Sequence, residues 1–387
     1  MALNRKIARI DLASHQVEVC HIPYEWRRKF LSGRGLGAYL LFRNLTRGCD
    51  PLKPPNCAVI STGILGATGA GFFECAGVST KSPLTRLVTF FPVFGGFAGE
   101  MRWAGYDHLI ITGKAKHPIF LCIRNGEIEL RDGKRLIGKS APESFAIIRK
   151  DLKDDDIRAI LIDPPGEDRI GLSGIITDCG WSSGKTGLGS VLNSKNIKGI
   201  VCRGGLDLEV KHPSKLLSFY KELFDRFVGS SDWSFKTDPF MPEAPSSFTG
   251  EELIAHSQWG MKMPRMEINE MIADSLGLCN FFSSDRTPIH SIGTIFHNLI
   301  QMASGLEISE SDLIDIAFRC RAIERLLDIR ETSVDENLRK TSSSGIMKKD
   351  YRNFSEFYRE NGWDKRSLVK LRVLKTLEID ELWPLMR

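Results

Sequence analysis

The amino-acid sequence predicts an α+β protein. A β-rich N-terminal domain, with two sheets and interspersed helices, precedes a mostly α-helical C-terminal domain. Short apolar segments of strand length crowd the first two hundred residues, whereas apolar residues recur at helical spacing after residue 308. Between these regions, 229–250 mixes proline, serine and aromatic residues without periodicity. We therefore expect domains at 1–208 and 261–387, joined by a linker and central region at 209–260.

Strands are predicted at several places in the first domain. Residues 7–10 and 16–22 read as a hairpin that opens the chain, and 109–113, 119–124 and 127–132 read as successive strands. Asn125-Gly126 lies between the last two and predicts a tight hairpin, because both residues tolerate positive φ. Glycines are dense between 33 and 99, which indicates backbone packed closely against backbone or a ligand.

Helices are predicted in the second domain. Ser309 and Asp312 resemble a capping box, and an apolar face follows, with Arg and Glu residues on the opposite face. That apolar face consists of Leu313, Ile316, Cys320, Ile323 and Leu327. Residues 341–345 are a polar break, and a last helical segment with leucines at 368, 371, 374 and 377 ends the chain.

Composition excludes several classes of protein. The net charge of +5 is mild, and no basic run exceeds three residues, so nucleic acid is not an expected partner. No segment approaches the ~20 apolar residues of a spanning helix, and we expect a cytoplasmic protein. Nine scattered cysteines without CxxC spacing predict neither a disulfide framework nor a zinc site.

A glycine-rich loop, DCGWSSGKTGLGSVLNSKN at 178–196, contains the Gly-Lys-Thr of a phosphate-binding loop. A Walker A loop needs a glycine five positions before Gly184, where this chain has Cys179. Gly180 is one residue too close, so we do not expect a nucleotide hydrolase. The run GRGLG at 33–37 is not a dinucleotide fingerprint either, because it lacks the final glycine and opens no βαβ unit. An independent phosphate-ligand site at 184–189 remains a third, weaker hypothesis.

A set of motifs along the first 205 residues resembles the tungsten-containing aldehyde:ferredoxin oxidoreductase family. The resembling segments occur in family order: SGRGLGAYLLF (32–42), STKSPLT (79–85), GGFAGEMRWAGYDHLIITGKA (95–115), PPGEDRI (164–170) and GKTGLGSVLNSKNIKGI (184–200). Near the end, DSLGLC (274–279), the helix at 308–330 and YRENGW (358–363) are similar to the family's C-terminal part.

The resemblance implies a tungsten or molybdenum bis-pterin cofactor resting on the N-terminal domain, because the cofactor performs this family's chemistry. The positions that it implies as cofactor-binding are Lys81, Gly95, Gly184, Lys185, Thr186, Gly187, Asp274, Gly277 and Leu278. In the family, the aspartate corresponding to Asp274 accepts hydrogen bonds from pterin nitrogens. An aspartate at a turn or helix end is an equally good structural interpretation of Asp274.

The chain departs from the family pattern at several places. The family's C-x-x-C-x-x-x-C group lies in long helical segments, whereas the sixty or so residues at 206–270 contain no cysteine. Cys279 is then the remnant of a ligand set for a [4Fe–4S] cluster, which needs four ligands, and we expect no cluster. A family arginine that meets the pterin phosphates aligns with Cys75, and an asparagine that helps bind magnesium aligns with Pro92. Trp181 is expected to fill space that a pterin would occupy.

Two functional hypotheses follow from these departures. The first is a shortened, non-catalytic partner that binds a full-length family member, a ferredoxin or another electron-transfer subunit; a homodimer is also compatible with the sequence. The second is an active oxidoreductase that oxidises an aldehyde to a carboxylic acid and passes electrons to a ferredoxin-like partner. The altered Cys75 and Pro92 favour the first, and the retained Asp274, Gly277 and Lys185 favour the second. Catalytic residues cannot be assigned from the sequence.

Overall fold

The computed structural model describes residues 6–69, 74–163, 173–182, 187–228, 254–256, 262–278, 289–331 and 370–386. Several predictions fall outside these residues. They concern the linker at 229–250, the polar break at 341–345, PPGEDRI and YRENGW, and the site residues Gly184, Lys185, Thr186 and Cys279.

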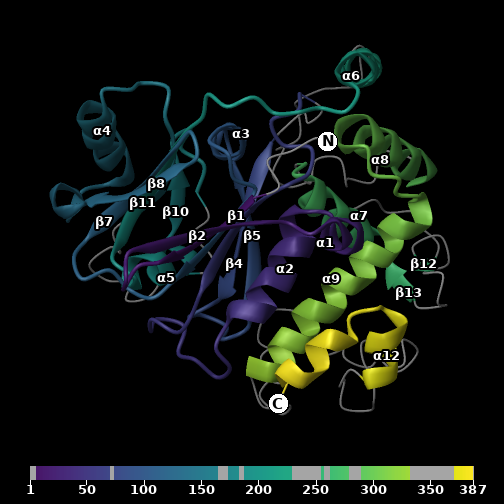
Figure 1. Cartoon of the computed structure of the whole chain (residues 1–387), viewed down its shortest axis with the longest axis horizontal. Coiled ribbons are helices and arrows are strands. Elements are labelled where there is room, and N and C mark those ends of the chain that lie inside the picture. Colours follow the sequence, from purple (N-terminus) through teal and green to yellow (C-terminus); the bar gives the residue numbers. More distant parts are fainter. Residues whose placement is uncertain are drawn as a thin grey trace, which may run out of the picture.

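Two mixed sheets form the N-terminal half, as predicted (Figure 1). Sheet A has, in spatial order, β2 (Gln16–His21), β1 (Lys6–Asp11), β6 (His108–Thr112), β3 (Ala58–Thr62), β4 (Cys75–Lys81) and β5 (Val88–Phe94). Sheet B has β10 (Ile175–Thr177), β9 (Arg158–Ile162), β11 (Ile197–Arg203), β7 (Ile119–Arg124) and β8 (Glu127–Asp132). A small pair, β12 (Ile254–His256) and β13 (Lys262–Pro264), lies outside both sheets.

The predicted hairpins are confirmed. β1 and β2 pair antiparallel over six residues each, and β7 and β8 pair across the turn at Asn125-Gly126. Asn125 has φ of 47° and Gly126 has φ of 89°, which is why these two residue types occur there.

Helices accompany the sheets and dominate the C-terminal half. The N-terminal half contains α1 (Tyr24–Phe30), α2 (Gly33–Asn44), α3 (Phe97–Trp103), α4 (Ala141–Leu152), α5 (Leu188–Ser194) and the 3₁₀ helix η1 (Lys134–Leu136). The C-terminal half contains α6 (Pro213–Val228), α7 (Arg265–Leu276), α8 (Ile289–Ser304), α9 (Glu310–Glu331), α12 (Leu371–Thr376) and η4 (Asp380–Met386).

Sheet A is the central layer, and the alternation of its side chains sets what each face contacts. On one face, Ile7, Val59 and Ile110 join a core cluster with α2, α7, α8 and α9. On the other face, the neighbouring residues Ala8 and Ile60 join a second cluster with the inner side of sheet B. The outer side of sheet B packs on α4 in a third cluster. The order is therefore helices, sheet A, sheet B and α4.

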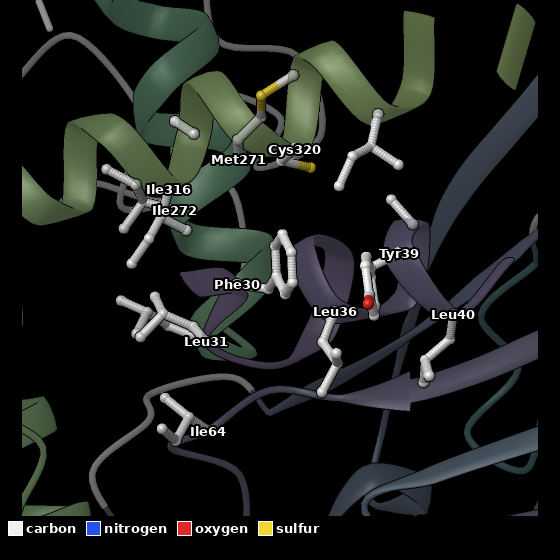
Figure 2. Close-up of a cluster of buried hydrophobic side chains, with 14 of the residues drawn as sticks. Phe30, Leu31, Leu36, Tyr39, Leu40, Ile64, Met271, Ile272, Ile316 and Cys320 are labelled. Atoms are coloured by element: carbon white, nitrogen blue, oxygen red, sulfur yellow. The ribbon is translucent and has the colours of Figure 1, made fainter. Parts of the chain in front are cut away.

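Helix α2 belongs to the N-terminal half in sequence and to the helical layer in space. Figure 2 shows Leu36 and Tyr39 of α2 in one buried cluster with Met271 of α7 and Cys320 of α9. The hydrophobic core is thus continuous across the boundary that we predicted at residue 208.

Helix α9 begins with the predicted capping box. The Ser309 backbone N–H donates to Asp312 Oδ2 at 2.8 Å, and the Asp312 N–H donates to Ser309 Oγ at 3.1 Å. The predicted apolar face is buried, but the opposite Arg and Glu face is not solvated as its polarity suggested. Arg319, Arg330 and Glu331 are each less than one tenth exposed. This face contacts α2 and the C-terminal segment, so its charges are paired inside the protein.

The C-terminal end of α9 is anchored by a buried ion pair with sheet A. Lys81 Nζ lies 2.9 Å from Glu331 Oε2 and donates to the Cys49 carbonyl at 2.9 Å. Glu331 also accepts from the Gly48 N–H at 2.9 Å and from Arg330 Nε at 3.0 Å. The predicted cofactor contact of Lys81 stays a prediction, and the structure gives its ammonium these two partners.

We predict that Glu331→Ala costs about 3 kcal/mol of stability, because it leaves the buried ammonium of Lys81 without its counter-charge. The double variant Lys81→Met/Glu331→Ala should recover only the part of that loss that comes from the Lys81 ammonium, since Arg330 still loses its carboxylate partner. Urea unfolding of both variants and the wild type measures the difference. If the two variants lose stability equally, the ion pair has no coupling and the interpretation of this contact is wrong.

Candidate functional site

The retained DSLGL segment forms the end of α7 and the turn that follows it, and this turn docks directly on sheet A. The Cys75 N–H donates to the Gly277 carbonyl at 3.1 Å, and the Leu65 N–H donates to the Leu276 carbonyl at 3.0 Å. Gly277 has φ of 83°, and a Cβ on Gly63 would lie 1.9 Å from the Gly277 nitrogen. Glycine is therefore required at both positions for the two backbones to meet.

Asp274 lies at the start of this turn and is buried against Arg34 of α2. Its Oδ2 lies 3.0 Å from Arg34 Nη1, whereas its Oδ1 is buried and has no hydrogen-bond partner among the residues that the structure describes. Burial raises the pKa of Asp274 to about 7, and the nearby Arg34 charge only partly opposes this rise. Asp274 is thus a buried carboxyl with one oxygen available to a ligand.

Arg34 is shared among carboxylates from two helices. Its Nε and Nη2 donate to the two oxygens of Glu324 on α9 at 2.7 and 3.2 Å, and its Nη1 also donates to Glu270 on α7 at 3.2 Å. Its guanidinium lies 5.3 Å from the centre of the Phe90 ring. The fork shape of arginine suits this bidentate arrangement with Glu324.

Asp328, one turn beyond Glu324 on α9, is a second carboxyl, and it is half-buried. Its Oδ1 accepts the Val88 N–H at 3.1 Å, and burial raises its pKa to about 7. Sequence analysis missed this group of charged residues. Arg34 lies in a glycine run that was compared with nucleotide motifs and with the family pattern but not with a buried ion pair, and Glu324 was seen only as part of the polar face of its helix.

At Cys75, the position that we predicted to correspond to a phosphate-binding arginine of the family, the structure has a buried thiol. Cys75 is 2% exposed, and its Sγ lies 3.5 Å from the Leu278 carbonyl oxygen. Leu278 is itself buried. The docked turn therefore covers this side chain with backbone and apolar atoms.

The neighbouring end of β5 is covered by aromatic and sulfur atoms. The Trp181 ring lies 4.8 Å from that of Phe94 and 5.5 Å from that of Phe91. Gly95 has φ of 119°, and a Cβ placed on it would lie 3.0 Å from Cys179 Sγ. Trp181 thus packs on the aromatic rings of β5, and its expected overlap with the space of a pterin stays a prediction.

Of the remaining positions discussed in the sequence analysis, Gly187 and Pro92 are described by the structure. Gly187 is the residue before α5 and has φ of 72°, so only glycine suits that backbone. Pro92 pairs with Gly77 from the edge strand β5, where the missing N–H of proline is tolerated. The positions at 184–186 and Cys279 lie outside the described residues.

These residues can be compared with the needs of a bis-pterin cofactor. Asp274 fits, because its Oδ1 is a buried oxygen without a partner. In the described part of the chain, the predicted phosphate end does not fit, since a thiol and a proline stand at the two positions that we predicted to correspond to a cation and an amide oxygen of the family. Within the described ranges, no group of three or more His, Cys, Asp or Glu residues could hold a metal ion.

The surroundings of His108 favour a structural role over a catalytic one. It is fully buried on the central strand β6, with Nδ1 2.9 Å from Ser61 Oγ and Nε2 3.2 Å from Ser32 Oγ. Burial lowers the pKa of His108 to about 4. Since Ser32 donates to the Thr62 carbonyl at 2.7 Å, we assign the proton to Nε2, and the chain of hydrogen bonds is complete. His108 therefore has a structural role.

We predict that Asp274 makes stability fall as pH rises. Its pKa is about 7 in the folded protein and 3.8 in the reference state, so the folded state holds the proton more tightly between these values. The stabilisation is complete below pH 4 and is lost as pH rises through 7. Relative to the wild type, Asp274→Asn should therefore gain on the order of 3 kcal/mol between pH 4 and pH 8. Urea unfolding across this range measures the gain, and a pH-independent difference would contradict it.

Two family models match the chain. The model of the aldehyde ferredoxin oxidoreductase N-terminal domain matches residues 7–204, and that of domains 2 and 3 of the same enzyme matches residues 231–379. The described part of the chain contains no helix that is both long and apolar enough to cross a bilayer.

Two curated relatives come from Pyrococcus furiosus. The tungsten-containing aldehyde ferredoxin oxidoreductase is 33% identical over 217 residues, which are 56% of this chain and 36% of that protein. The aliphatic sulfonate oxidoreductase, WOR-like subunit, is 31% identical over 243 residues, which are 58% of this chain and 39% of that protein. The chain thus spans little more than a third of the length of the curated relatives it matches.

A solved structure shares the fold at low identity. It is the active site complex BamBC of benzoyl coenzyme A reductase with 1,5-dienoyl-CoA, which aligns with a TM-score of 0.78 and 16% identity. The alignment covers 99% of this chain and 98% of that chain. The fold and the two family models agree, and the chain belongs to the aldehyde ferredoxin oxidoreductase family.

Proposed function

We propose that this protein is a shortened, non-catalytic member of the aldehyde ferredoxin oxidoreductase family that acts as an accessory partner in a cytoplasmic oxidoreductase system. The observation that carries the proposal is the buried thiol of Cys75, which lies beneath the Gly277–Leu278 turn where the family pattern places a phosphate-binding arginine. Its partner would be a full-length family member, a ferredoxin or another electron-transfer subunit.

The physical argument concerns the charge of the pterin phosphates. A phosphate transferred to a protein interior needs cations or several hydrogen-bond donors, because an unpaired charge there costs many kcal/mol. Cys75 supplies a thiol, which carries no positive charge to meet a phosphate. Pro92 supplies no side-chain donor or acceptor. The described residues therefore oppose phosphate binding at this end of the site.

Relatives of this chain are compatible with an accessory role. One curated relative is described as a WOR-like subunit of an oxidoreductase, and the solved structure with the same fold is described as a complex, BamBC. Both names describe assemblies, and we extend membership of an assembly to this chain as part of the proposal.

A catalytic role is the second candidate, and Asp274 favours it. Its buried Oδ1 has no partner, and a pterin nitrogen would supply one. If a tungsten or molybdenum bis-pterin were held there, it would supply the redox chemistry of aldehyde oxidation. Asp274 would orient its ring, and Arg34 would hold the carboxyl in place.

We predict that the protein purified without oxygen from its native host contains neither tungsten nor molybdenum in stoichiometric amount, and no pterin. Plasma mass spectrometry and pterin fluorescence measure both. A full-length oxidoreductase should copurify with it. Metal near one atom per chain together with pterin would instead establish the catalytic candidate.

We predict that Cys75→Arg destabilises the protein by roughly 3 kcal/mol or more and restores no affinity for phosphate. The added guanidinium would be buried under the Gly277 turn without a carboxylate partner. Cys75→Ser is the matched control and should cost less, since the hydroxyl can donate to the Leu278 carbonyl. Unfolding and pyrophosphate titration measure the two effects. A stable Cys75→Arg variant that binds pyrophosphate would show that the phosphate cradle is intact, and the accessory proposal would fail.

A further inference from the structure

Loops from the two sheets meet at one end of the molecule and are joined by a buried lysine. The Nζ of Lys195 donates to the Pro54 carbonyl at 3.2 Å and to the Gly113 carbonyl at 3.0 Å. These bonds join the loop at 50–56, which precedes β3, to the loop at 113–118, which connects β6 to β7. The start of β3 and the end of β6 therefore lie beside the start of β11 in sheet B.

A third loop, 132–135 at the end of β8, lies against the same place. The Gly133 N–H donates to the Pro118 carbonyl at 2.9 Å. The middle loop is also fixed from its other side, since Asn196 Nδ2 donates to the Ala115 carbonyl at 2.6 Å. The backbone at this end is thus held by the fold, so a binding partner would not have to order it.

These three loops carry five exposed cations, which we call the basic end. They are Lys53, Lys114, Lys116, Lys134 and Arg135. Among the residues that the structure describes, none of the five has a carboxylate within ion-pair distance. Asp50 and Asp132 are the acidic residues of the same loops, and each accepts a backbone N–H of its own turn, from Leu52 and Lys134, at 2.9 Å. The basic end therefore keeps a positive excess that its own fold does not neutralise.

The opposite end of sheet B is different, because its charges are paired. At the end of β7, Arg124 Nη2 lies 2.6 Å from Asp154 Oδ2, and at the end of β11, Arg203 Nη2 lies 3.1 Å from Asp156 Oδ2. Positive charge is thus concentrated where these strands begin and balanced where they end. Concentrated charge of one sign raises the surface potential and attracts partners of the opposite sign.

We propose that the basic end is the docking surface for an acidic face of this chain's protein partner. The proposal rests on the accessory role, because it names the surface through which the partner of that role binds. Five cations without internal partners supply the charge complementarity. Leu52, which is 39% exposed, lies next to Lys53 and adds an apolar contact among the cations.

The composition of the loops favours a protein over other anionic partners. Residues 50–56, 113–118 and 132–135 contain no Phe, Tyr or Trp. Single-stranded nucleic acid is usually bound by stacking bases on aromatic rings, and membrane-surface segments usually insert aromatic and leucine side chains from an amphipathic helix. An acidic protein surface needs only the exposed cations and a small apolar contact.

Charge reversal tests the surface on the full chain. The probe is the full-length oxidoreductase that copurifies with the wild type, separated from it by salt. For Lys114→Glu/Lys116→Glu, the association rate constant at low ionic strength should fall by about tenfold or more, and its dependence on salt should weaken. Lys53→Glu/Lys134→Glu, on the two neighbouring loops, should have the same effect. Stopped-flow binding measures the rates, and circular dichroism verifies that each variant is folded.

Lys150→Glu/Lys153→Glu is the matched control. It makes the same change in net charge with two exposed lysines of the charge-balanced end, and it should change the association rate constant less than about twofold. A zero-length carbodiimide reagent applied to the wild-type complex should join Lys114 or Lys116 to a carboxylate of the oxidoreductase.

The outcomes separate this proposal from the accessory role. If no oxidoreductase copurifies with the wild type, both fail together. If the oxidoreductase copurifies but binds Lys114→Glu/Lys116→Glu as fast as it binds the control, the accessory role stands and the docking surface is wrong. If that variant keeps the oxidoreductase and instead loses binding of the wild type to phosphatidylserine vesicles, an anionic membrane is the occupant and the protein partner is overturned.

Discussion

The interaction on which the arrangement most depends is the shared contact of Arg34 with three carboxyl groups of the C-terminal helices. A cation in the first turn of a helix is unfavourable, because the helix dipole places partial positive charge there. Glu324, Asp274 and Glu270 reverse this penalty by surrounding the guanidinium. Helix α2 is thereby tied to both α7 and α9, and these helices cover one face of sheet A.

The glycines on either side of Arg34 make this contact possible. A Cβ on Gly33 would lie 2.1 Å from the Asp274 carbonyl oxygen, and one on Gly35 would lie 2.4 Å from the Phe30 carbonyl oxygen. The GRGLG run therefore lets the start of α2 approach the end of α7 closely. A motif that resembled a nucleotide fingerprint is explained by helix packing, which agrees with its poor spacing for phosphate binding.

Two carboxyl groups near Arg34 have a raised pKa because they are taken out of water, and the neighbouring arginines oppose the rise only in part. Three arginines, Arg34, Arg321 and Arg325, lie among the carboxyls of Glu267, Glu270, Asp274, Glu324 and Asp328. Burial raises the pKa of Asp274 and of Asp328 to about 7.

The sequence predicted the fold well where local signals decide structure. The hairpin at Asn125-Gly126 needs two residues that tolerate positive φ, and the capping box at Ser309 needs two residues three positions apart. Both can therefore be predicted without tertiary information. It predicted the charged interior poorly. Nothing local distinguishes Glu324, which meets Arg34 from 290 positions away, from a solvated glutamate on the same helix. Pairing over such distances depends on the packing of sheet A and α2, which periodicity does not encode.

Retention of the DSLGL turn has a structural explanation that is independent of any cofactor. Gly277 must be glycine because Gly63 touches its backbone, and the turn supplies carbonyls to the N–H groups of Cys75 and Leu65. Loss of these contacts would expose unpaired backbone groups between the N-terminal sheet and the helices. The motif would therefore be kept in a protein that has lost the cofactor. A position is more informative about function when packing does not dictate which residue it must hold. At Cys75, an arginine would need a phosphate or a carboxylate nearby, and a thiol needs neither. The substitution there is consequently better evidence about function than the conserved-looking turn beside it.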